Sequence, residues 1–68
     1  MENKRLSDKI IEAIESYGGE FHSDEIPQII VSVIRNSDEK SYGVVSVEIN
    51  NMIENGILTE HENYVSIA

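Results

Sequence analysis

Residues 42–58, YGVVSVEINNMIENGIL, decide the fold because helix and strand compete for them. The first half has the β-branched composition of a strand, whereas the second half is typical of the end of a helix. In a helix, five apolar side chains share one face: Tyr42, Val45, Ile49, Met52 and Ile53. Asn50 and Asn51 interrupt a strand but leave this spacing intact, and Gly56 follows where left-handed residues end helices. We therefore predict a helix over residues 42–55.

An amphipathic helix is also predicted near the N-terminus. Its apolar stripe consists of Leu6, Ile10, Ala13, Ile14 and Tyr17. Asn3 is the expected N-terminal cap, and Gly18 with Gly19 supplies the positive-φ residues that end a helix. The predicted helix covers residues 3–17.

The segment over residues 26–34 is the third helix candidate. Ile26, Ile29, Ile30, Val33 and Ile34 keep helical spacing. A cap at Ser23 or Asp24 and a first-turn Pro27 favour a helix. A buried strand is the alternative interpretation, because IIVSVI has strong strand propensity.

Three short segments are strand candidates. Residues 20–22 are extended, and residues 57–59 and 64–67 form a hairpin in which Asn63 adopts the left-handed conformation of a tight turn. Together with the three helices they predict a single α+β domain over residues 1–68.

Composition narrows the functional class. The chain of 68 residues has no cysteine and a formal charge of −8, so aliphatic packing must hold it together and nucleic acid is repelled at long range. A core this small favours self-association, and we expect a homodimer or a protein partner.

No apolar run is long enough for a membrane span or signal peptide, so we expect a cytoplasmic protein that does not bind membranes. Eleven isoleucines against two alanines are typical of AT-rich viral or prokaryotic genomes.

The order of these elements resembles that of winged helix-turn-helix domains. The resemblance is strongest in VEINNMIENGIL, residues 47–58, where Met52-Ile53, Glu54-Asn55 and Gly56 lead into the apolar Ile57-Leu58. It implies that residues 42–55 occupy the position of a recognition helix and that residues 57–67 form a minimal wing. Many members of the family bind DNA and regulate transcription.

The outward face of the 42–55 helix is the candidate contact surface. Opposite its apolar stripe lie Val44, Val47, Asn51 and Glu54, with Asn50 at the edge. Exposed valines beside amides suit a protein partner, whereas asparagine also reads adenine in the major groove. An ordinary solvated face is the third interpretation.

Two basic residues flank the turn before that helix. Arg35 and Lys40 are candidate phosphate contacts, although a helix-dipole role for Arg35 and a solvated loop for Lys40 explain them equally well. Lys4, Arg5 and Lys9 lie in the first helix, and residues 41–68 contain no lysine or arginine. Protein contacts are therefore expected to dominate, and a dimeric, sequence-specific DNA-binding repressor is the alternative.

The acidic residues Asp8, Glu12 and Glu15 form a stripe along the first helix. We interpret it as a solvent-facing surface, and nucleic-acid mimicry towards a basic protein is the weaker alternative. His22 and His61 lack the spacing of metal ligands. We expect neither a metal nor another cofactor, no small-molecule substrate and no enzymatic activity.

Overall fold

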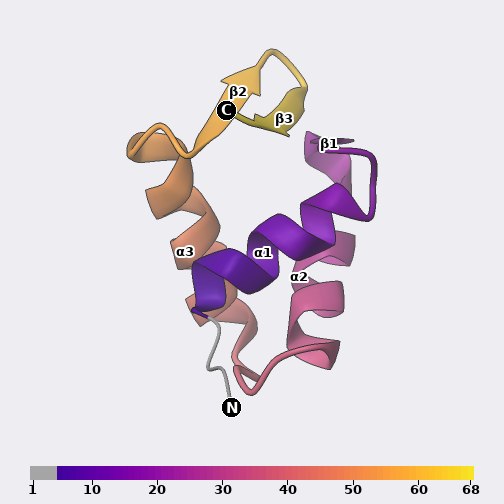
Figure 1. The fold of residues 1–68 in the computed structure, drawn as a ribbon, viewed down its shortest axis with the longest axis vertical. Helices are drawn as coiled ribbons and strands as arrows, with labels where there is room; N and C mark the ends of the chain where they lie inside the picture. The colour runs from indigo at the N-terminus through magenta and orange to yellow at the C-terminus, as the bar shows by residue number, and fades with distance from the viewer. Residues whose placement is uncertain (1–4) are drawn as a thin grey trace.

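The computed structural model describes residues 5–68 and has the predicted α+β class (Figure 1). In chain order the elements are α1 (Leu6–Glu15), β1 (Glu20–His22), a 3-10 helix η1 (Ser23–Glu25), α2 (Ile26–Arg35), α3 (Tyr42–Glu54), β2 (Leu58–His61) and β3 (Tyr64–Ile67). The helix alternative is thus confirmed for residues 26–34 and 42–55. Within residues 5–68, every helix is too short or too polar to cross a lipid bilayer.

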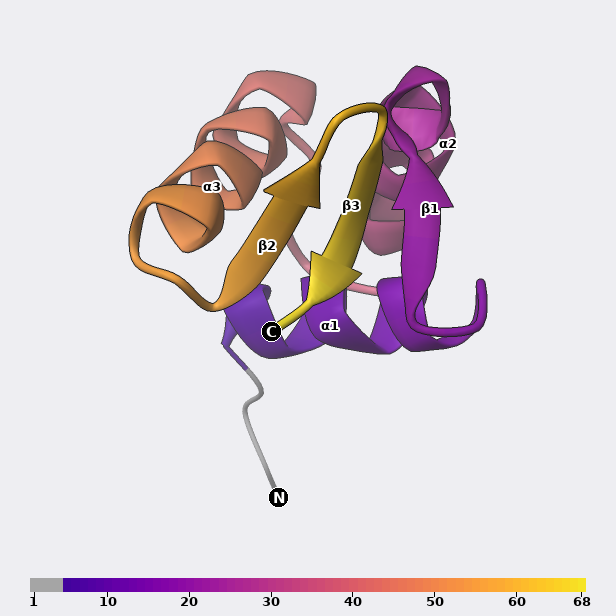
Figure 2. The same ribbon diagram turned by 90° about the horizontal axis from the view of Figure 1, so that it is seen from above.

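The three strands form one antiparallel sheet in the order β1-β3-β2. Figure 2 shows this sheet lying across the three helices, with β3 in the centre. The predicted hairpin is present, and its register pairs Leu58 with Ile67 and His61 with Tyr64. On the other side of β3, Phe21 faces Val65. The short 20–22 segment is therefore a full member of the sheet.

The hairpin turn corrects the prediction for Asn63. Only residues 62 and 63 connect the strands, and the left-handed residue is Glu62, with a φ of 51°. The carbonyl of Asn63 instead accepts a hydrogen bond of 2.7 Å from the backbone N–H of Ser23. This contact fastens the turn to η1, so Asn63 is oriented by a tertiary interaction that local turn preferences do not include.

One apolar core lies between the sheet and the helices. Its buried members come from every α-helix and strand: Ile10, Ala13, Ile14, Phe21, Ile29, Ile30, Val33, Val45, Ile49, Met52, Leu58 and Val65. Two tyrosines that were predicted on apolar stripes are exposed, Tyr17 by 41% and Tyr42 by 47%. Both lie at the end of a stripe, Tyr17 beyond the last residue of α1 and Tyr42 at the first residue of α3. The helical spacing of apolar residues continues to these two positions, but the core that covers the rest of each stripe does not extend that far.

The start of α2 differs from the prediction. Neither Ser23 nor Asp24 acts as the side-chain cap; the Nδ1 atom of His22 accepts from the N–H of Asp24 at 3.1 Å. The carboxylate of Glu25 accepts from the N–H of His22 at 2.8 Å, which completes a reciprocal capping pair. Because η1 precedes α2, the cap lies several residues upstream of Pro27. The ring of His22 also meets Tyr64 edge-on at 5.2 Å, so the sheet helps to hold this cap.

The first helix begins at Leu6, with Arg5 extended in the N-cap position. The predicted cap, Asn3, lies outside the described residues, as does Lys4. At its other end, Gly18 and Gly19 have φ values of 93° and 92°, as predicted for a helix terminator.

Candidate functional site

Both ends of α3 are fixed by its own flanking residues. Ser41 is the N-cap, and its hydroxyl oxygen accepts from the N–H of Val44 at 3.3 Å. After the helix, the N–H of Gly56 donates to Ile53 and that of Ile57 to Met52, at 3.2 and 2.9 Å. This is the Schellman arrangement, and Gly56 supplies its left-handed residue with a φ of 79°. These bonds fix where α3 begins and ends, whereas the burial of Val45, Ile49 and Met52 in the core decides which side chains point outward.

The structure exposes every residue of the predicted contact surface. Val44 and Val47 keep 47% and 58% of their surface, and Asn50, Asn51 and Glu54 are also exposed. The neighbouring Val45 is completely buried on the opposite side. We call the exposed side the outer face of α3 and define it by these residues: Gly43, Val44, Val47, Asn50, Asn51 and Glu54. It is apolar and amide-rich, with a single charged residue.

Gly43 is the member of this face that the sequence prediction omitted. It lies four positions before Val47 and is exposed. A Cβ built on Gly43 meets nothing closer than the hydroxyl oxygen of Ser41 at 4.0 Å, and its φ is not among the positive values. Nothing inside the described fold requires glycine there. The available signal in the sequence was its helical spacing from Val47 and Asn50.

Lys40 has a structural role. Its ammonium group donates to the carbonyls of Ile34 and Ser37, both at 2.9 Å. The carbonyl of Ile34 belongs to the last turn of α2, where backbone acceptors lack intrahelical partners and positive charge is favourable. Lys40 therefore helps to cap α2, and it is also exposed, as the solvated-loop interpretation expects. Two of its three N–H donors are engaged.

Arg35 differs from Lys40 in its surroundings. It is the last residue of α2 and is exposed. The loop that follows is held by its own polar groups, since Ser37 Oγ accepts from Glu39 N–H at 3.2 Å and Glu39 accepts from Ser41 N–H at 3.0 Å. Both cations before α3 are thus exposed, and Lys40 also donates two hydrogen bonds to backbone carbonyls.

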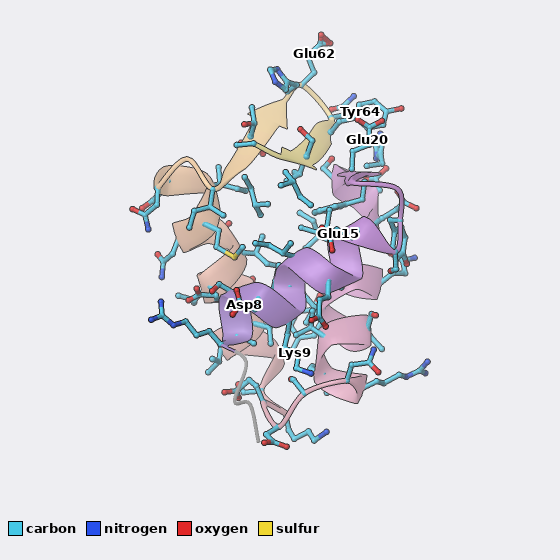
Figure 3. The ribbon with its side chains drawn as sticks, in the orientation of Figure 1. Asp8, Lys9, Glu15, Glu20, Glu62 and Tyr64 are labelled. Carbon is cyan, nitrogen blue, oxygen red and sulfur yellow. The ribbon has the colours of Figure 1, made fainter. Side chains whose placement is uncertain are left out.

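The acidic stripe lies on α1, and all three of its residues are exposed. Figure 3 shows the side chains of Asp8 and Glu15 along this helix, with Lys9 nearby. Asp8 accepts weakly from the N–H of Arg5 at 3.4 Å, so it also completes the first turn of α1. The position of the stripe agrees with a solvent-facing side of an amphipathic helix.

A shallow hollow of about 340 Å³ lies between α1 and α2. Its lining residues are Lys9, Glu12, Ala13, Ser16, Ser32 and Asn36. The hydroxyl of Ser16 already donates to the carbonyl of Ala13 at 2.6 Å, and the amide of Asn36 donates to the carbonyl of Ser32 at 2.9 Å. The side chains of Ser16 and Asn36 thus complete helix ends.

The histidines are separated across the sheet. His22 is held in its capping pair with a side chain that is 34% exposed, and its Nδ1 atom lies 3.5 Å from the carboxylate of Asp24. His61 is exposed at the end of β2. Over residues 5–68, no three side chains of the metal-ligating types come together.

Comparison with known proteins adds no assignment. No protein family, curated protein or solved structure was found to match this chain.

Proposed function

We propose that this protein is a non-enzymatic winged-helix module that regulates transcription through protein contacts made by the outer face of α3. The observation that carries the proposal is the exposure of Val44 and Val47 on a helix with no lysine or arginine from Ser41 to the end of the chain. Exposed aliphatic side chains beside amides are typical of the centre of a protein interface, whereas phosphate contacts need basic residues.

The fold supports the winged-helix part of the proposal. The element order is the one that the sequence resemblance implies, and β1 joins the hairpin to form a three-stranded sheet. In Figure 1, α3 stands at one side of the molecule, and its residues 43, 44, 47, 50, 51 and 54 are exposed. A helix in this position is available to a partner over several turns.

Electrostatics favours a protein over a nucleic acid. The formal charge of −8 opposes the approach of a phosphate backbone, and two of the three N–H donors of Lys40 already bind backbone carbonyls. The buried side chains of residues 5–68 are all apolar, which gives no support to an enclosed catalytic site.

Affinity capture from the host organism, with matched variants, tests the proposal. We expect a specific protein to be retained by the wild type and lost from Val44→Asp/Val47→Asp. Val31→Asp is the control, because Val31 is an exposed valine on α2, 41% exposed and outside the outer face of α3. Equal capture by all three proteins would contradict the proposal.

A dimeric DNA-binding repressor is the second candidate, and the exposure of Asn50, Asn51 and Arg35 favours it. A dimer would double the few available phosphate contacts. Titration with random duplex at about 50 mM salt would reveal such binding, because nonspecific affinity is then strongest. Binding that is lost in Arg35→Ala would support the repressor and contradict the main proposal. Light scattering would give the oligomeric state.

A further inference from the structure

The glycines of this chain divide into two classes. Gly18, Gly19 and Gly56 have positive φ values and end helices, so their type follows from backbone geometry. Gly43 has no such reason, and the space beside it is open. Glycine weakens a helix relative to alanine, and no internal contact compensates for this effect at Gly43. The missing side chain of Gly43 has one evident consequence, which is on the surface of the protein: another chain could approach the backbone of α3 closely at this point.

Apolar side chains neighbour Gly43 on α3, and acidic side chains follow further along the helix and the chain. On the helix surface Gly43 neighbours Val47, while Glu48 lies four residues from Val44 and Glu54 closes the outer face at its C-terminal end. Over residues 36–68 the acidic side chains are Asp38, Glu39, Glu48, Glu54, Glu60 and Glu62. The one basic side chain of this stretch is Lys40, which is bound to the backbone of α2 and the following loop.

We infer that the outer face of α3 binds a lysine- or arginine-rich segment of a partner protein that places an apolar side chain against Gly43, Val44 and Val47. This inference rests on the proposed function and specifies the partner's chemistry. Charge complementarity selects the basic segment, because its cations meet Glu48 and Glu54 while its apolar side covers the valines. A second copy of this chain would bring another −8 to the same surface, so like charges oppose that occupant.

Synthetic peptides test the inference by NMR titration of the isotopically labelled protein. The probe is a Leu/Lys amphipathic peptide of about 16 residues, long enough to form a helix. A Ser/Lys peptide keeps the charge without the apolar side, and a Leu/Glu peptide keeps the apolar side with the opposite charge. We expect the Leu/Lys peptide to shift the amide signals of Gly43, Val44 and Val47, with an affinity at least about tenfold higher than that of either control.

Variants of the protein sharpen the same experiment. Gly43→Ala folds without strain, because its Cβ would meet only Ser41 Oγ at 4.0 Å. We expect it to bind the Leu/Lys peptide roughly fivefold more weakly, since a methyl group would block the close approach. Val47→Lys should abolish binding, whereas Val31→Lys on α2 should bind like the wild type.

Several results would overturn the inference. They are equal binding of the Ser/Lys peptide, preferential binding of the Leu/Glu peptide, no binding of any peptide, or shifts confined to Asp8, Glu12 and Glu15 on α1. Preference for Leu/Glu at the same face would leave the proposed protein contact standing and reject only the basic partner. Duplex DNA binding at this face would reject both.

Discussion

Helices α2 and α3 have similar compositions but use them differently. Both are rich in β-branched residues, and each buries three side chains: Ile29, Ile30 and Val33 in α2, and Val45, Ile49 and Met52 in α3. In α2, Ile26 and Ile34 also pack against the core, which leaves Val31 as the exposed aliphatic side chain. In α3, two of three valines are exposed on a face that also contains a glycine.

This difference separates side chains that form the core from side chains that do not. The apolar residues of α2 are almost all accounted for by the core, so the helix is explained by packing. The buried side of α3 is likewise explained by packing in the core. Its outer face contributes little to folding and contains residues with poor helix propensity. Variants that distinguish core positions from surface positions on these helices therefore test the comparison directly.

The largest loss of stability is expected at the buried positions that α2 and α3 have in common. Ile30→Ala in α2 and Ile49→Ala in α3 each remove a side chain that is 1% exposed, and each should lower the free energy of unfolding by about 2–5 kcal/mol. Chemical denaturation monitored by circular dichroism would measure the loss. Since domains of this size have a small margin, one or both variants should be largely unfolded. A loss confined to α2 would show that α3 is not an integral part of the core.

Adjacent valines distinguish the two faces of α3. Val45→Ala should cost about 2 kcal/mol because this side chain is completely buried, whereas Val47→Ala, at 58% exposure, should stay within about 0.5 kcal/mol of the wild type. Urea midpoints of the two variants give the comparison. Similar destabilisation by both would contradict the assignment of the outer face.

The two glycines at the ends of α3 should respond with opposite signs. Gly56→Ala forces a side chain into a φ of 79° and should cost about 1–2 kcal/mol. Gly43→Ala should raise the free energy of unfolding by up to about 1 kcal/mol, because alanine favours the helix and meets no obstacle. Thermal unfolding of both variants would test this pair, and destabilisation by Gly43→Ala would reveal an internal role that its open surroundings exclude.

The smallest expected difference in stability is between variants of the two basic residues near the end of α2. Lys40→Met should lower the free energy of unfolding by about 0.5–1 kcal/mol, because it leaves the carbonyl of Ile34 without its charged donor. Arg35→Met should have less effect, since Arg35 is exposed and not engaged in this cap. If Arg35 proved the more important residue, its dipole interaction would outweigh the hydrogen bonds of Lys40.

Local patterns predicted the helices and the outer face well. Spacing placed Val45, Ile49 and Met52 inward and Val44, Val47, Asn50 and Asn51 outward, because a helix repeats every few residues whatever its neighbours are. The same reasoning failed for Tyr17 and Tyr42, since periodicity does not say where the opposing layer ends. It also left Gly43 unnoticed, because a missing side chain is noticed only when its surroundings are known.

By itself, the sequence determined the α+β class, the left-handed glycines Gly18 and Gly56 that follow α1 and α3, and the lack of positive charge after Lys40. These properties depend on residues close together in the chain or on composition alone. The tertiary structure decided that His22 caps η1 beside Tyr64, that the Asn63 carbonyl binds the backbone of Ser23, and that Lys40 caps α2. Each of these contacts depends on where a strand or loop is placed in space, and that placement is set by the packing of the whole sheet against the helices.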